Sequence, residues 1–121
     1  MAREDYRSAS YEIWQAMAAG WDRERCWMWE ASRAVSEEML KALGPEPGQT
    51  ILELAAGTGE TGFAAARAIG PDGRLISTDF AGEMVAAARR ESERLGLANV
   101  EHREMDAERA AVDVGVGRRG A

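Results

Sequence analysis

The feature that most constrains the fold is a set of three glycines at positions 57, 59 and 62, spaced as G-x-G-x-x-G. They follow a short apolar run over residues 50–54 and precede an alanine-rich, helix-like segment over residues 63–69. Glycine lets the backbone turn tightly and removes the side chains that would keep a ligand away from the N-terminus of the next helix. The free N–H groups at that terminus attract an anionic group. The pattern therefore predicts a strand–loop–helix unit that binds a ligand at its loop.

The apolar pattern on both sides of this loop alternates between helical and strand periods. It predicts helices over residues 10–20 and 22–43, then, beyond the helix at 63–69, a strand over 74–79, a helix over 81–95 and a strand over 99–104. Residues 1–8 are polar and are expected to be loose, Gly20 is expected to end the first helix, and Asp22 to cap the second. Strands that alternate with helices imply right-handed crossovers. The predicted fold class is α/β: a Rossmann-like parallel sheet with flanking helices, incomplete at about three strands and preceded by two N-terminal helices.

Four tryptophans lie in the two predicted N-terminal helices, at positions 14, 21, 27 and 29. Trp27 is expected on the buried stripe of the second helix, together with Val35 and Met39. Trp14 and Trp21 are equally suited to cover a ligand and to pack the helices against the sheet. The pattern leaves these two alternatives open.

Two carboxylates at strand ends indicate the class of ligand. Asp79 ends the second predicted strand, where it can accept the ribose hydroxyls of an adenosine-bearing cofactor. Glu53 lies at the end of the first strand, where it disfavours a pyrophosphate because like charges repel. S-adenosylmethionine carries an ammonium and a sulfonium instead, and it tolerates that carboxylate. Two alternatives are an NAD-dependent oxidoreductase and a glycine turn that serves packing alone.

The residues of the loop resemble a known family. Residues 51–62, ILELAAGTGETG, resemble the first motif of class I S-adenosylmethionine-dependent methyltransferases, especially the branch with the ubiquinone and menaquinone biosynthesis enzymes. Residues 75–80, LISTDF, are similar to the second motif of that family, and residues 100–108, VEHREMDAE, resemble the third. The three matches occur in the order of the family and cover the N-terminal, cofactor-binding half of its domain.

The resemblance implies a role for several side chains. Glu53 and the loop would face the methionine part of S-adenosylmethionine, Asp79 would hold the ribose, and Asp106 would bind the adenine amino group. The residues that it assigns to cofactor binding are Glu53, Ala55, Gly57, Thr58, Gly59, Asp79, Phe80, Met84, Asp106 and Ala107. Packing in the core explains the presence of Met84 at this position equally well. The resemblance implies transfer of a methyl group to a small molecule, and no residue is nominated as a catalytic base.

The composition limits the partners. Asp and Glu number 21 against 15 Lys and Arg, a net charge of −6 that disfavours a nucleic-acid partner. The one cysteine and one histidine do not form a metal-ligand set. The sequence has neither a long apolar run nor a signal peptide, so we expect no membrane contact and a cytoplasmic location.

The pattern changes near the end of the chain. It predicts an N-terminal helical segment over residues 1–48, a cofactor-binding half over 49–108 and a divergent, disordered tail over 109–121. Residues 115–121, GVGRRGA, are a poor continuation of the strand that residues 112–114 could begin. This suggests a truncated or frame-shifted copy, an inactive fragment or a half-domain that needs a partner. Without a fourth strand the first strand would have a free edge, which favours self-association.

Overall fold

Three parallel strands, each joined to the next through a helix, organise the computed structural model, which describes residues 3–109. The elements are α1 (Arg3–Arg23), α2 (Arg25–Leu43), β1 (Thr50–Glu53), α3 (Glu60–Ile69), β2 (Arg74–Asp79), α4 (Gly82–Arg94), β3 (Val100–Glu104) and a 3₁₀ turn, Ala107–Arg109. The strand order is β1-β2-β3, and both pairings are parallel. The α/β class, the parallel sheet and the two preceding helices agree with the sequence prediction.

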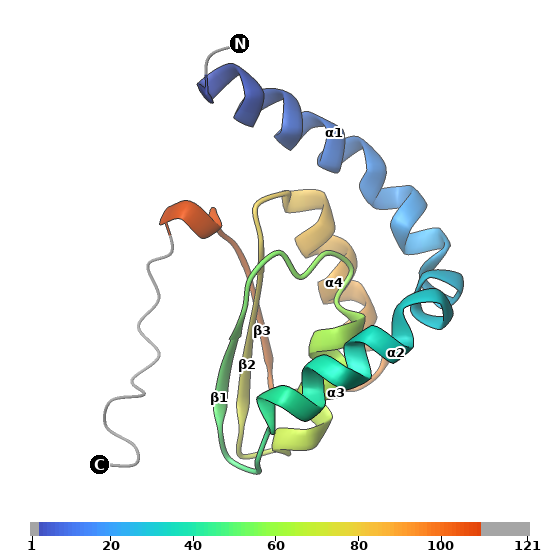
Figure 1. Ribbon diagram of the computed structural model, residues 1–121, viewed down its shortest axis with the longest axis vertical. Helices are drawn as coiled ribbons and strands as arrows, with labels where there is room; N and C mark the ends of the chain where they lie inside the picture. The colour runs from blue at the N-terminus through green and yellow to red at the C-terminus, as the bar shows by residue number, and fades with distance from the viewer. Residues whose placement is uncertain (1–2, 110–121) are drawn as a thin grey trace.

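The core lies between the sheet and the helices that connect its strands. Ile51, Leu75 and Val100 are aligned across the three strands and therefore face the same side of the sheet. Ala66 and Ile69 of α3 pack on this row, and Ile69 is completely buried. Figure 1 shows α2, α3 and α4 on one side of the sheet. Because the three strands are parallel, their carboxyl ends and the loops that follow them lie at one edge of the sheet.

The first helix is longer than the sequence predicted. It begins at Arg3 and continues through Gly20 to Arg23. The expectation that residues 1–8 are loose was therefore wrong for residues 3–8, and the expected helix end at Gly20 was wrong as well. The reason is tertiary contact, because Arg3 and Arg7 form ion pairs with Glu108. Farther along α1, Ala18 packs against the start of α4. These contacts stabilise polar residues in a helix that local pattern does not predict.

The second helix buries a polar face. Trp27, Val35 and Met39, the expected buried stripe, have exposed fractions of 66%, 64% and 59%, so this prediction was wrong. Arg25 and Ser36 are the buried residues of α2. Asp22 belongs to α1 and does not cap α2, which starts after Glu24. Within residues 3–109 no helix combines the length and apolar character needed to cross a membrane.

The described sheet has two outer edges, one at β1 and one at β3, and the edge at β1 is flanked by exposed apolar side chains. In residues 3–109, β1 pairs with β2 alone, and Leu52 and Leu54 are 39% and 45% exposed. The fourth strand considered at residues 112–114 lies outside the described residues, as does the predicted tail beyond Arg109. The boundary expected at residues 48 and 49 stays a prediction, although it falls between the end of α2 and the start of β1.

Truncation of Ile69 is expected to destabilise the chain strongly. Ile69→Ala removes three carbons from a completely buried position, which should lower the free energy of unfolding by about 2–4 kcal/mol. Ile13→Ala is the matched control, because Ile13 is 56% exposed and its truncation should cost less than about 0.5 kcal/mol. Urea unfolding followed by circular dichroism measures both; equal losses in the two variants would contradict this placement of the core.

Candidate functional site

The loop after β1 is built from residues with positive φ. Gly57 and Gly59 have φ values of 59° and 99°, and Ala55 has a φ of 54°, which is rare for a residue with a side chain. A Cβ atom on Gly59 would lie 2.5 Å from Cζ of Phe63, so this position requires glycine for space as well. A Cβ atom on Gly57 would meet no atom within 4 Å. The space in front of Gly57 is therefore open to a ligand.

The Asp79 carboxylate ties this loop to the end of β2. One oxygen accepts a hydrogen bond from the Gly57 N–H at 2.9 Å, and the other accepts from the Ala81 N–H at 3.0 Å. Asp79 is 8% exposed, so these bonds are largely shielded from water. Each carboxylate oxygen can accept a further hydrogen bond. Asp79 can therefore hold the loop and still bind a hydroxyl group of a ligand.

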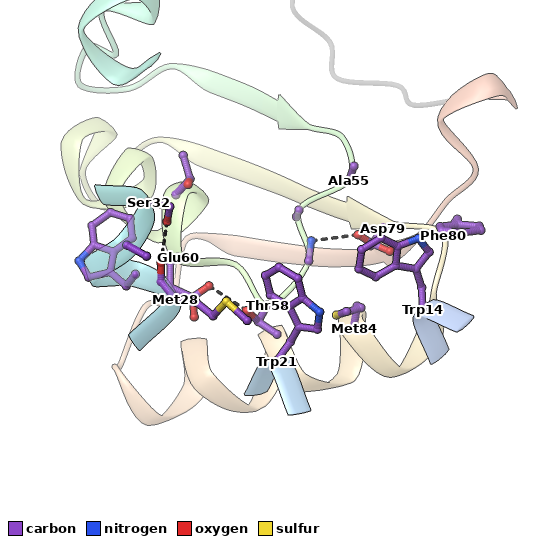
Figure 2. Close-up of a pocket in the computed structure, with 15 residues that line it drawn as sticks. Trp14, Trp21, Met28, Ser32, Ala55, Thr58, Glu60, Asp79, Phe80 and Met84 are labelled. Carbon is purple, nitrogen blue, oxygen red and sulfur yellow. Dashed lines mark hydrogen bonds between the residues drawn. The ribbon is translucent and has the colours of Figure 1, made fainter. Parts of the chain in front are cut away.

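A cavity of about 560 Å³ lies in front of the loop. On the sheet side it is lined by Ala55, Gly57, Thr58, Asp79, Phe80 and Met84. The opposite wall comes from the N-terminal helices, with Trp14 and Trp21 from α1 and Met28 and Trp29 from α2. Figure 2 shows Trp14 beside Phe80 and Asp79, and Met28 beside Thr58. Trp14 and Trp21 pack against each other with ring centroids 6.1 Å apart, so both line the cavity while they also pack.

A second cavity, of about 690 Å³, lies beyond Phe80. Asp106 and Ala107 line it together with Tyr11 and Arg7 of α1. Tyr11 meets Phe80 edge to face at 5.8 Å, and Arg7 forms an ion pair with Asp106. The sequence did not nominate Tyr11 or Arg7, because their partners Phe80 and Asp106 lie 69 and 99 residues away in the chain, which periodicity cannot detect.

Glu53 takes a different position from the one expected. It shares the helix-covered face of the sheet with Ile51, two residues earlier, and lies beneath α3. A Cβ atom on Gly62 would be 2.2 Å from Oε1 of Glu53, so the third glycine of the motif makes room for this carboxylate. Glu53 lines the apolar groove beside β1 and is absent from the lining of the cavity in front of the loop.

The environment of Glu53 alters its protonation. The pKa of this carboxyl is raised to about 7, chiefly by burial and also by the nearby Glu60 and Asp79 carboxylates, while the Ser77 hydroxyl acts in the opposite direction. Its Oε1 atom is buried and has no hydrogen-bond partner. A carboxyl group with this pKa is about half protonated at neutral pH. Because Glu53 also lies outside the lining of the cavity, the repulsion of a pyrophosphate that was expected from it is weakened there.

The structure thus divides the ten predicted site residues into groups. Six line the cavity in front of the loop: Ala55, Gly57, Thr58, Asp79, Phe80 and Met84. Asp106 and Ala107 line the second cavity, to which Phe80 also contributes. Gly59 shapes the loop and Glu53 is buried beneath α3.

Comparison with known proteins agrees with this geometry. A family model described as a methyltransferase domain matches residues 45–114, more than half of the chain. An arsenite methyltransferase of Halobacterium salinarum is 42% identical over 57 residues, and a demethylmenaquinone methyltransferase of Bacillus cytotoxicus is 32% identical over 69 residues. These matches cover 47% and 57% of the chain.

A solved structure extends the similarity to three dimensions. A SAM-dependent methyltransferase from Aquifex aeolicus superimposes with a TM-score of 0.58 and 28% identity, over 64% of this chain and 41% of the other. The chain spans 15% of the length of the Halobacterium relative and 29% of the Bacillus relative. The similarity therefore concerns one part of the domain of those proteins.

Replacement of Glu53 should change how stability depends on pH. Because the pKa of this carboxyl is raised on folding from 4.5 to about 7, its contribution to stability is complete below pH 4.5 and is lost as pH rises towards 7. Relative to Glu53→Gln, the wild-type chain should lose roughly 2–3 kcal/mol of unfolding free energy between pH 5 and pH 8. Urea unfolding of both proteins at the two pH values tests this; parallel pH profiles would show that Glu53 does not titrate in this range.

Proposed function

Because the chain belongs to the methyltransferase domain family, we propose that it forms the cofactor-binding portion of an S-adenosylmethionine-dependent methyltransferase that acts on a small molecule. One observation carries the proposal: the buried Asp79 carboxylate holds the open Gly57 turn at the edge of a cavity of about 560 Å³. The described residues fit the cofactor, because an acceptor for ribose hydroxyls and a bare backbone turn face the same space.

Different residues around the two cavities bind the ribose and the adenine of the cofactor. Asp79 accepts the hydroxyl groups of the ribose, and Phe80, which lines both cavities, contacts the adenine ring. Asp106 and Ala107 bind the edge of the adenine. Arg7 and Asp106 form an ion pair in this structure. When the cofactor binds, Arg7 therefore either shares the Asp106 carboxylate with the adenine or releases it.

The loop and the first turn of α3 receive the methionine part of the cofactor. The first N–H groups of a helix have no partner within it, and they attract a carboxylate. Glu60, the first residue of α3, also lines the cavity, so the proposal places an acidic side chain beside this end of the cofactor.

For methyl transfer, this chain has to align the cofactor and exclude water from the reacting atoms. Bound S-adenosylmethionine supplies a methyl group that its sulfonium already activates. Trp14, Trp21 and Met84 give the cavity apolar walls, which keep water away from the reacting atoms. The titratable side chains of the lining are Glu60 and Asp79, and both already accept hydrogen bonds. We therefore assign neither of them as a base.

The outer edge of β1, which no other strand among residues 3–109 covers, supports a proposal about assembly. Apolar side chains with exposed fractions between 39% and 59% gather there from α2, β1 and the loop after it: Met39, Leu43, Leu52 and Leu54. A free strand edge with apolar flanks is a template for pairing. A second copy of the chain presents the same edge and the same apolar side chains, so we propose that two chains associate through β1.

Cofactor binding is tested by isothermal titration of the 121-residue chain with S-adenosylhomocysteine and, separately, with NAD. We expect binding of S-adenosylhomocysteine alone. Asp79→Ala should weaken it at least about tenfold, because hydrogen bonds to a charged group are worth about 1.5–3 kcal/mol. Asp72→Ala, in an exposed turn, is the matched control and should bind like the wild type. Preferential binding of NAD, or binding of neither ligand by a folded chain, would overturn the proposed function.

Association through β1 is tested by light scattering coupled to size exclusion. The wild-type chain should form dimers at concentrations near 0.1 mM, a range in which weak edge contacts are populated. Leu54→Lys should shift it to the monomer, since a lysine at a strand edge opposes pairing. Ile13→Lys places the same charge at another exposed position, on α1, and should not change the mass. A wild-type monomer at this concentration would contradict the assembly.

A further inference from the structure

A buried arginine connects the N-terminal helices to the glycine loop. Arg25 is the first residue of α2, and its side chain is 10% exposed. Its guanidinium donates hydrogen bonds to the Thr58 carbonyl of the loop and to the Glu60 carboxylate. It also donates to Asp22 at 2.6 Å and to the Ala87 carbonyl at 3.4 Å. Arg25 thus joins α1, the loop, α3 and α4 at one point.

The contact with Glu60 has a consequence for charge at the loop. Glu60 starts α3 and lines the cavity, so its carboxylate occupies the positive end of the helix where an anionic ligand group would bind. Its Oε1 atom pairs with Arg25, and its Oε2 atom accepts the Thr58 hydroxyl at 2.9 Å. Arg25 therefore neutralises the Glu60 carboxylate and fixes its direction. Without this partner, an uncompensated negative charge would face any anion at the loop.

Arg25 does not reach the cavity itself. The cavity lining includes Thr58 and Glu60 but not Arg25. The guanidinium nitrogens are directed to the partners named above, and Nε lies 3.9 Å from Glu91. Any effect of Arg25 on a bound molecule must therefore pass through Glu60 and the Thr58 carbonyl. This makes it a positioning residue.

We infer that Arg25 is the residue that lets the loop accept the carboxylate of the amino-acid end of the cofactor, by neutralising Glu60 and holding it against Thr58. The inference rests on the proposed function, which places S-adenosylmethionine at this loop. It goes beyond that function because it assigns recognition of one end of the cofactor to a charge pair between α2 and α3. The ribose and adenine contacts should be independent of this pair.

Two ligands separate this role from a general structural one. S-adenosylhomocysteine has the amino-acid end, whereas 5′-methylthioadenosine has the same adenosine and sulfur but lacks it. Isothermal titration with both, on the full chain, measures the ratio of their dissociation constants within one preparation. Arg25→Met should weaken S-adenosylhomocysteine binding by roughly tenfold or more. The reason is that the Glu60 carboxylate, without its partner, then meets the carboxylate of the ligand at short range in a poorly solvated site. It should change 5′-methylthioadenosine binding by less than about threefold.

A second change tests whether Arg25 acts through Glu60. The double variant Arg25→Met/Glu60→Gln removes the uncompensated charge, so its affinity for S-adenosylhomocysteine should return to within about threefold of the wild type. Glu60→Gln alone keeps the arginine and should bind S-adenosylhomocysteine as well as the wild type or better. Glu60→Gln also tests the inference if Arg25→Met does not fold. Arg90→Met is the matched control, because Arg90 pairs with Asp22 at 3.4 Å from an exposed position on α4.

The outcomes are distinguishable. Equal weakening of both ligands by Arg25→Met, or no recovery in the double variant, would overturn the role of Arg25 and leave the proposed function intact. Weaker S-adenosylhomocysteine binding by Glu60→Gln would overturn the role of Arg25 as well. A wild-type chain that binds neither ligand would overturn the proposed function, and this inference with it.

Discussion

The contact on which the site depends is the pair of hydrogen bonds that Asp79 accepts from the backbone of Gly57 and Ala81. It joins the loop after β1 to the end of β2, so two segments with no local reason to meet become one rigid surface. A carboxylate that accepts two backbone N–H groups in a buried position is held tightly in orientation. The cavity, the exposed backbone of the loop and the placement of Phe80 all follow from this connection.

The N-terminal helices add the other wall, and they attach to the loop through polar contacts. Arg25 and Ser36 are buried at this interface, and Ser36 shares a hydrogen bond of 2.8 Å with Thr61. Apolar side chains of α2 such as Trp27 and Met39 face outward instead. A polar, directional interface fixes the position of the helices more specifically than an apolar one, because each donor requires its own acceptor. The tryptophans of α1 that line the cavity rest on apolar contacts instead, because Trp21 packs against Ala18, Ala81 and Met84, and Trp14 packs on Trp21.

Glu53 illustrates how a motif residue can serve the fold. Its carboxyl group lies under α3, in the space left by the missing Cβ of Gly62, and burial raises its pKa to about 7. The glycine motif therefore has three functions in this chain. Gly57 opens the backbone to the cavity, Gly59 leaves space for Phe63, and Gly62 accommodates a buried acid. The function of Gly62 can be seen only once the packing of α3 on β1 is known.

The pattern of residues was enough to predict the α/β class, the bounds of β2 and the identity of the loop, because strand and helix periods and glycine spacing are local properties of the chain. It also identified six of the residues that line the cavity in front of the loop, Asp79 among them. Contacts across the fold set the start of α1 at Arg3, buried Arg25 of α2 instead of Trp27, and brought Tyr11 and Arg7 to Phe80 and Asp106. Those outcomes depend on partners far away in the sequence. Each of these outcomes was determined by the energy of ion pairs or aromatic contacts across the fold. Local periodicity carries no information about such contacts.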